Sequence, residues 1–408
     1  MPTTIRSIIH PSGTNPDSGY YDNVFTDLRA WWASPLVTGN IVSRNELHIA
    51  YLASGFYHDS FLTMSSGDAI VDSTHYYEIT AQTGGEFDGT LIDLDSKSIQ
   101  GSYNFYSYGY IIFVDIPYTR VNSIYLTGHI PSVGTTVPYI NLLAIAGNAS
   151  FSVIDKVCVM NMHNSPLFFP GNISAFGISI YGASTGIELS NCLSINTHIH
   201  YSANINDATM RGISIVADNV KAHNNVTLYN SVATGMFGRP SYTTDSYGLT
   251  ANTTSTNSIV KNNIACNNYN SLGSGIDINP LYVNLSYNAS SDTSLSGVSN
   301  SITGLNPSLE FISMSTGISL NSDTFYSGGN YHLLGTSQLY GAGTFPSGNI
   351  FTDIDGDVQI VPWDIGLDAT ATTGTISVPS GVLLYSSHDN STFIVPLSTP
   401  GNTIYANS

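Results

Sequence analysis

Two acidic residues, Glu188 and Asp218, come nearest to a catalytic pair in this chain. A glycoside hydrolase needs two carboxyl groups flanking the scissile bond, roughly 5 to 10 Å apart. Acids are sparse between residues 150 and 280, and none forms an Asp-Asp or Asp-x-Asp pair. A lyase would instead need Arg or Lys as its base beside a calcium site, and Lys221 has no carboxylate cluster near it in sequence. The sequence therefore predicts no catalytic residue, with Glu188 and Asp218 as the alternative.

Two motifs could bind a metal. "DIDGD" places Asp353, Asp355 and Asp357 at alternate positions, but its Gly is fourth rather than sixth and no Glu follows at the twelfth position of a calcium loop. We therefore expect a turn. "HIH" puts His198 and His200 on one face of a strand, where copies could meet a metal on a threefold axis, although a stacked or solvated pair is commoner. No cofactor is predicted.

A repeat indicates the elements that must position these residues. Apolar residues stand at alternate positions with Asn or Asp in the middle, as in "VKAHNNVTL" from Val220 to Leu228. Alternation predicts strands, and recurrence predicts that each strand pair stacks on its copy as a parallel β-solenoid. The middle positions tolerate left-handed backbone and can bond to the next coil. We expect them to form one ladder, with rungs about 4.8 Å apart. They are Asn122, Asp155, Asn191, Asn224 and Asn262, at intervals of 33, 36, 33 and 38 residues.

Composition limits the partners. Ten Lys and Arg against 28 Asp and Glu give a net charge of −18 at pH 7, so nucleic acid and anionic membranes are not expected partners. No apolar run is long enough to span a bilayer, and the first 21 residues show no secretory signal. Cys158, Cys192 and Cys266 are odd in number and lie in repeat strands, Cys266 in the inward frame, so we expect no disulfide or metal framework.

The ends of a solenoid need covering. Val24, Leu28, Trp31 and Trp32 form a helical apolar stripe that Asp22 could cap and Pro35 would end. The expected organisation is an N-terminal arm and capping helix over 1–50, a parallel β-helix over 51–369 and a strand-rich C-terminal extension over 370–408. In the extension, "TISVPSGVLLYSS" and "STFIVPLS" predict a hairpin that must pack on something. We expect Leu383, Leu384, Phe393 and Ile394 to carry assembly contacts, with an intramolecular cap as the alternative.

Several segments resemble the right-handed parallel β-helix proteins common in bacteriophage and environmental genomes. They are "TDLRAWWASPLVTG", "IPYTRVNSIYLTG", "NPSLEFIS", "NYHLLGTSQLYGAG" and "FTDIDGDVQIVPWDIGLDA", and the resemblance extends over roughly residues 20 to 369. The family often has a basic residue after the Asp-x-Asp-Gly turn and an acidic residue after Trp-Asp-Ile-Gly, where this chain has Gln359 and Asp368. The resemblance implies an all-β, right-handed, single-stranded parallel β-helix.

Two classes of function fit this chain. The first is a non-enzymatic structural protein of a bacteriophage virion surface, such as a capsid decoration, fibre or spike, assembled in the host cytoplasm. Its expected partners are other virion proteins, further copies of the chain (a trimer is possible) and a host surface glycan. The alternative is a carbohydrate-binding or polysaccharide-degrading β-helix, because exposed tyrosines in "YNFYSYGY" (103–110) could stack on sugar rings. The absence of an export signal favours the virion protein.

Overall fold

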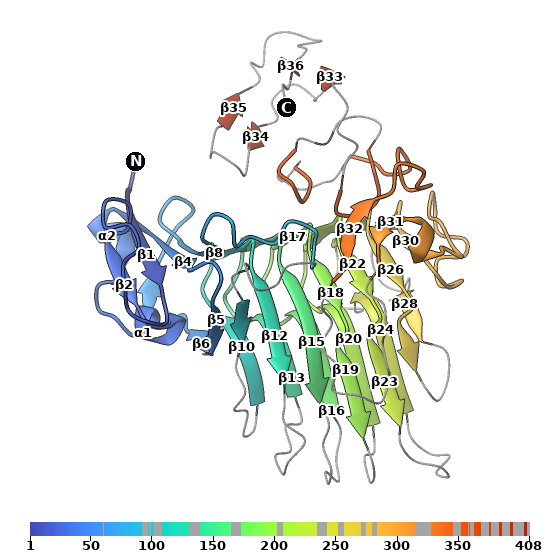
Figure 1. Ribbon diagram of the computed structural model, residues 1–408, viewed down its shortest axis with the longest axis horizontal. Helices are drawn as coiled ribbons and strands as arrows, with labels where there is room; N and C mark the ends of the chain where they lie inside the picture. Colours follow the sequence, from blue (N-terminus) through green and yellow to red (C-terminus); the bar gives the residue numbers. More distant parts are fainter. Residues whose placement is uncertain are drawn as a thin grey trace.

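The alternating apolar residues form short parallel strands that stack into three long sheets (Figure 1). This computed structural model describes residues 1–59, 61–91, 97, 99–101, 108–129, 139–164, 173–201, 207–234, 243–251, 257–270, 275–279, 284–314, 328–345, 352–357, 359, 363–368, 375–376, 383–385, 392–394 and 404–405. Each complete turn of the chain adds one strand to two of these sheets and one or two strands to the third, which defines a right-handed parallel β-helix. The predicted fold class is therefore confirmed.

Sheet A runs the whole length of the β-helix. In spatial order its strands are β2 (Asn23–Phe25), β1 (Thr3–Ile9), β4 (Glu46–Leu52), β8 (Tyr77–Ala81), β11 (Arg120–Asn122), β14 (Val153–Asp155), β17 (Glu188–Ser190), β21 (Lys221–His223), β25 (Ile259–Lys261) and β29 (Asn284–Ser286). Because β1 and β4 already pair in parallel, sheet A begins at residue 3. It therefore includes residues that the sequence assigned to the N-terminal arm.

Sheets C and D complete each coil. Sheet D contains β6 (Leu62–Met64), β10 (Tyr108–Val114), β13 (Tyr139–Ile145), β16 (Ile173–Ile180), β20 (Asp207–Ile215), β24 (Thr243–Ala251) and β28 (Ile276–Asn279). Sheet C contains β5 (Tyr57–Asp59), β9 (Ile99–Gly101), β12 (Tyr125–His129), β15 (Cys158–Asn164), β18 (Leu193–Ile195), β19 (His198–Tyr201), β22 (Val226–Leu228), β23 (Ser231–Thr234), β26 (Ile264–Cys266), β27 (Tyr269–Asn270) and β30 (Ala289–Ser290). Two-residue strands β3 (Gly39–Asn40) and β7 (Ala69–Ile70) pair in parallel as a separate small sheet.

The main core lies inside the coils. Apolar side chains from all three sheets meet there, including Ile154 of β14, Val159 of β15 and Ile178 of β16. Fully burying one such side chain contributes about 1.5–3 kcal/mol, so each coil is stabilised mainly by the layers above and below it. This explains why the apolar alternation repeats with the coil.

A short helix closes the N-terminal end of this core. Helix α1 (Leu28–Trp32) buries Leu28, Trp31 and Trp32, and the Trp32 ring meets Tyr77 edge-on at 5.0 Å. Its N-cap is Asp27, which accepts a hydrogen bond from the Ala30 N–H at 2.7 Å. The sequence interpretation placed the cap at Asp22 and Val24 in the helix; both were wrong, because Val24 belongs to edge strand β2.

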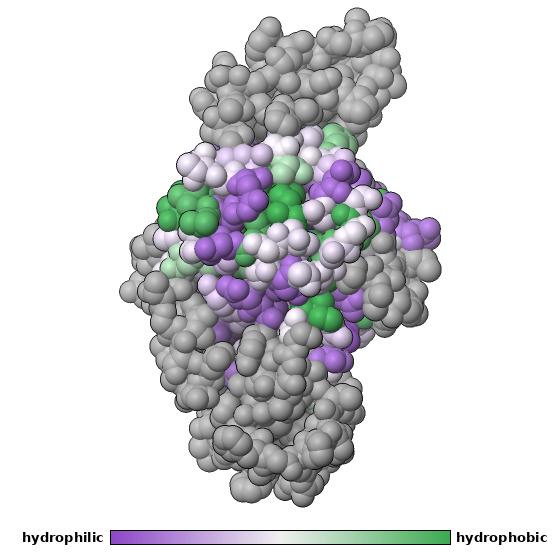
Figure 2. Space-filling view, turned by 90° about the vertical axis from the view of Figure 1, so that its right-hand side faces the viewer, coloured by the Kyte–Doolittle hydropathy of each residue, from purple (hydrophilic) through white to green (hydrophobic). Residues whose placement is uncertain are grey.

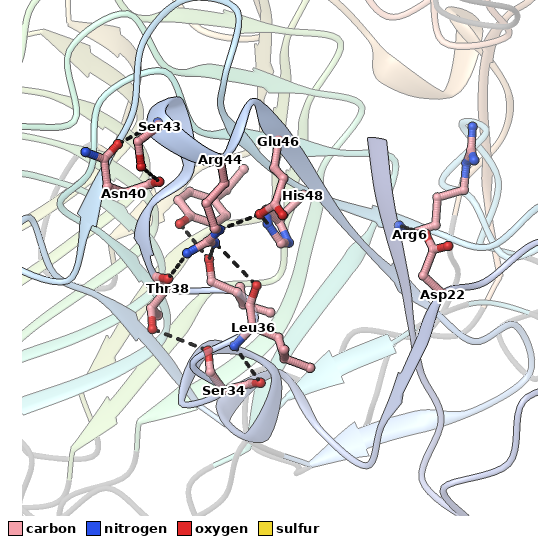
Figure 3. Close-up of polar contacts among 12 residues, drawn as sticks. Arg6, Asp22, Ser34, Leu36, Thr38, Asn40, Ser43, Arg44, Glu46 and His48 are labelled. Carbon is pink, nitrogen blue, oxygen red and sulfur yellow. Dashed lines mark hydrogen bonds and ion pairs between the residues drawn. The ribbon is translucent and has the colours of Figure 1, made fainter. Parts of the chain in front are cut away.

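A polar clamp fixes the chain beyond α1 (Figure 3). Arg44, at the end of α2 (Ile41–Arg44), donates to the carbonyl groups of Leu36, Val37 and Thr38 and lies 2.6 Å from Glu46. The same carboxylate lies 3.0 Å from Nε2 of His48, which is 1% exposed. One guanidinium thus satisfies several carbonyl groups at the N-terminal end. Neither α1 nor α2, the two α-helices in the described residues, is long enough to cross a membrane.

The chain after β30 closes the other end and then returns along the molecule. Leu295 inserts into the main core from the turns after β30. The described residues of 305–368, with the 3₁₀ helix η2 (Pro307–Leu309), β31 (Phe311–Ser313) and β32 (Asn330–Leu333), then cover the outer side of sheet C and form a second core with it. We call these residues the return segment. Figure 2 views this end, where apolar side chains are scattered among polar ones.

Candidate functional site

Glu188 is buried on the outward side of sheet A. It lies opposite Lys221 of the next coil, while its neighbour Leu189 points into the main core. The side chain is 4% exposed, and its Oε1 lies 3.3 Å from Nε2 of His223. A general acid must reach the glycosidic oxygen, which this carboxyl group cannot do in the present conformation. Glu188 instead pairs with His223.

Asp218 does not face Glu188, as a second catalytic carboxyl group would. It lies in the turn before β21, is half-buried and forms a bridge with Thr185 of the preceding coil. Glu188, in contrast, lies within a strand. The structure therefore does not present Glu188 and Asp218 as two carboxyl groups facing one solvent-filled groove.

Asp155 belongs to a buried polar group beside Glu188. Its Oδ1 accepts hydrogen bonds from the Ser190 hydroxyl at 2.7 Å and from the Asn191 amide at 2.9 Å. Asn191 also donates to the Thr352 carbonyl at 2.9 Å, which ties the return segment to the coils. Burial raises the pKa of Asp155, against the opposing charge of Lys156. These contacts hold the return segment in place.

The predicted five-residue ladder occupies two registers. Asn191, Asn224 and Asn262 take left-handed backbone at successive bends after sheet A, with φ of 52°, 58° and 57°. Asn122 and Asp155 stand in register with each other and with Ser190. These three are the last residues of β11, β14 and β17, one position before the bend. In those two coils the left-handed position falls to Ser123 and Lys156. The prediction that all five stack in one column was wrong by one residue at two positions.

The continuous amide ladder stands one residue after the bend. Asn225 donates to Asn263 and Asn263 donates to Asn288, each from Nδ2 to Oδ1 at 2.9 Å. A second ladder runs from Asn230 through Asn268 to Asp277, again at 2.9 Å. These side chains are buried, with backbone N–H groups of the adjacent coil completing their bonds. The sequence contained this signal as the repeated Asn-Asn pair.

The "DIDGD" segment forms a turn, as expected. Oδ1 of Asp353 accepts from the N–H groups of Asp355 and Asp357 at 3.0 and 2.8 Å. The turn also meets two residues that the sequence did not connect with it. Asp368 joins Asp353 and Asp355 so that one carboxylate oxygen of each lies within 4.8 Å of the others, and Nε2 of His332 lies 3.2 Å from Asp355.

This acidic cluster is electrostatically unfavourable by itself. Burial raises the pKa of Asp353 to about 7, and the charges of Asp355 and Asp368 act in the same direction. Burial likewise raises the pKa of Asp368 to about 6, although it accepts a hydrogen bond from the Leu333 N–H. Three carboxylates with an imidazole beside them are ligands that a divalent cation can use. They are the group in the described residues best suited to hold a metal.

The predicted histidine pair does not form an outward metal site. His198 is 5% exposed, and its Nδ1 lies 2.7 Å from the Ser231 hydroxyl, so it cannot face a symmetry axis between copies. The side chain of His200 lies outside the described residues. All three cysteines are free and buried. Cys266 lies in the second core under the return segment rather than in the inward frame.

The expected C-terminal hairpin is present as backbone pairing. β34 (Leu383–Tyr385) runs antiparallel to β35 (Thr392–Ile394), with Leu383 opposite Ile394 and Leu384 opposite Phe393. β33 (Thr375–Ile376) pairs in the same way with β36 (Ile404–Tyr405). The side chains of these strands lie outside the described residues, as do residues 103–107 of the tyrosine-rich segment.

The sheets and the return segment define the chain as a protein of the right-handed parallel β-helix class. No protein-family model matches it, and neither does any curated protein sequence. Among solved structures, the crystal structure of pectate lyase Pel9A aligns with 90% of this chain and 96% of its own, at 12% identity and a TM-score of 0.34. The likeness is distant, and nothing about activity follows from it.

Proposed function

We propose that this protein is a non-enzymatic structural component of a virion surface, a capsid decoration, fibre or spike. One observation carries the proposal. Glu188, the carboxyl group of the candidate pair that lies in a strand, is buried against His223, and the neighbouring Asp155 accepts hydrogen bonds from Ser190 and Asn191. A β-helix whose acids stabilise its own layers is suited to display rather than cleavage.

Two further features support the virion setting. The sequence segments between residues 20 and 369 that we interpret as similar to bacteriophage β-helix proteins favour this setting, and a net charge of −18 would keep many copies soluble before assembly. The partners in this proposal are other virion proteins and further copies of the chain.

Purification of virus particles from a host that produces the protein tests this setting. We expect its peptides to sediment with intact particles at a fixed copy number, and to remain after a high-salt wash. Dozens to hundreds of copies would indicate the capsid, and a handful would indicate the tail. Recovery only from the particle-free fraction would contradict the proposal.

The alternative function is polysaccharide cleavage. The observation in its favour is that Glu188 and Lys221 stand opposite each other on adjacent strands of sheet A, an acid beside a base. Glu188→Gln tests this alternative, because product release that it abolishes would assign catalysis to this pair.

A further inference from the structure

Two aromatic residues occupy strained positions at the bend that leads into sheet A. Tyr118 and Phe151 take left-handed backbone, with φ of 57° and 61°. Bulky residues rarely adopt this conformation, and it costs roughly 1–2 kcal/mol. Because Arg120 is in register with Val153, Glu188, Lys221 and Ile259, the bend positions of successive coils form one column. Its members are Tyr118, Phe151, Gly186, Asn219 and Asn257, and all five have positive φ.

The aromatic rings form a short stack that stops at a glycine. Tyr118 and Phe151 are parallel within 16°, with ring centroids 5.4 Å apart. On the next coil, a Cβ atom at Gly186 would lie 2.8 Å from Cδ1 of Phe151, so the ring reaches against the glycine and no third ring continues the stack. Phe151 is 51% exposed, although a buried site or a polar residue would cost less. The coil sets the left-handed backbone at this bend, so the exposure of a large apolar ring, rather than the strain, points to a ligand.

Amide groups follow the rings along the same column. Asn219 and Asn257 are exposed at the next two coils. With roughly 4.8 Å between coils, Asn219 stands about 10 Å from Phe151 along the column, a distance that one or two sugar rings span. An aromatic face followed by amide donors and acceptors matches a pyranose, whose axial C–H bonds give it an apolar face and whose rim carries hydroxyl groups.

Charge selects among sugars. The chain carries a net charge of −18, and Asp218 directly precedes Asn219. Two cations lie two residues beyond members of the column: Arg120, over the Tyr76 ring at 4.0 Å, and Lys221, opposite Glu188 on the adjacent strand. Uronate and other anionic sugars would therefore be repelled, whereas neutral ones would not.

We infer that the column from Tyr118 to Asn257 is a binding site for a neutral oligosaccharide, with Phe151 as its stacking residue. This inference extends the proposed function by naming a surface ligand, a neutral glycan that the displayed β-helix binds without cutting.

Saturation-transfer NMR tests the site with cellohexaose, maltohexaose and chitohexaose as neutral probes and pentagalacturonate as the anionic comparator. We expect transfer to at least one neutral probe, with its affinity reduced roughly tenfold, which is about 1.4 kcal/mol, in Phe151→Ala. Phe151→Asn, which suits the left-handed backbone as the native Asn219 does, should lose the same affinity. The matched control is Phe61→Ala, since Phe61 is 43% exposed on another part of the molecule, and it should bind like the wild type.

No transfer to any of the three neutral probes, or wild-type affinity in both Phe151→Ala and Phe151→Asn, would overturn the site. Either result leaves the rings as a packing contact only. Whether the protein is found in purified virus particles does not depend on glycan binding, so the virion proposal and the binding-site proposal can fail separately. Shortening of the bound probe during the experiment would contradict the non-enzymatic function while leaving the binding site standing.

Discussion

At the scale of single residues, asparagine has two different roles at the bends Asn224–Asn225 and Asn262–Asn263 after sheet A. The first Asn of the pair supplies left-handed backbone, and the second donates and accepts along the axis. Asn224 has only the first role, because its φ is 58° and both polar atoms of its buried side-chain amide have no hydrogen-bond partner. Asn263 shows the second, with bonds to Asn225, Asn288 and the Ala222 carbonyl.

The two roles predict opposite sensitivities. Asn263→Ala should lower the free energy of unfolding by about 2–4 kcal/mol, because it leaves buried groups on two neighbouring coils unpaired. Asn224→Gly should change it by less than about 1 kcal/mol, because glycine adopts the same φ and removes an unpaired amide. Denaturant unfolding of both variants checks this. Equal destabilisation would show that the bend conformation, not the ladder, determines stability.

The alternation of apolar residues and the recurrence of Asn made the strands and their stacking predictable, because both depend on local chemistry. The register of the bends was harder to predict. Ser123 and Lys156 hold left-handed backbone where the pattern favoured Asn122 and Asp155, since the coil imposes that geometry on whichever residue arrives there. At these two positions the packing of the coil, rather than the conformational preference of the residue, determines the backbone conformation.

At the scale of elements, the return segment is the feature that the repeat did not indicate. "DIDGD" could be assigned to a turn from its own residues. Its meeting with His332 and Asp368 depends on the path of the whole segment across sheet C, which no local pattern encodes. The outer side of sheet C is apolar because this segment covers it.

The acidic cluster predicts an unusual gain of stability. In a buffer with EDTA at pH 8, Asp353→Asn should raise the free energy of unfolding by about 1–3 kcal/mol, because it removes a buried charge that repels two others. The amide oxygen can still accept from the two turn N–H groups. Thermal unfolding with and without EDTA measures this. A calcium-dependent rise in the wild type that Asp353→Asn abolishes would contradict a purely structural turn and identify a metal centre.

The seal between the return segment and sheet C depends on a glycine. Gly366 has φ of 116°, and a Cβ there would lie 2.6 Å from Cδ1 of Ile264. Gly366→Ala should therefore loosen the segment and speed labelling of the buried Cys266 thiol by roughly tenfold or more, since the rate follows local opening. Gly328→Ala is the control, because its φ of 94° is also positive but no atom lies within 4 Å of the added Cβ. Unchanged Cys266 labelling in Gly366→Ala would show that the segment does not rely on this contact.

At the scale of the whole molecule, the two ends of the β-helix are closed by different means. Helix α1 closes the N-terminal end, and the turns around Leu295 close the other. The described part of the C-terminal extension pairs only within itself, as β33 with β36 and β34 with β35. The coils thus have caps of their own, which leaves the extension available for assembly.

Truncation after Ala369 tests that assignment. We expect a folded protein with the wild-type circular dichroism spectrum and melting temperature that no longer self-associates or joins particles. Light scattering and sedimentation measure the association. An insoluble or unfolded product would show that the extension is a cap, and normal assembly would show that it carries no assembly contact.

We propose that this β-helix displays a surface and does not cut polysaccharide. The most direct test incubates the purified protein with neutral and acidic bacterial surface polysaccharides, and measures new reducing ends together with the ultraviolet absorbance of unsaturated lyase products. We expect no product above a heat-inactivated control from any polymer. Release of oligosaccharides by the wild type, lost in Glu188→Gln while the fold is retained, would contradict it.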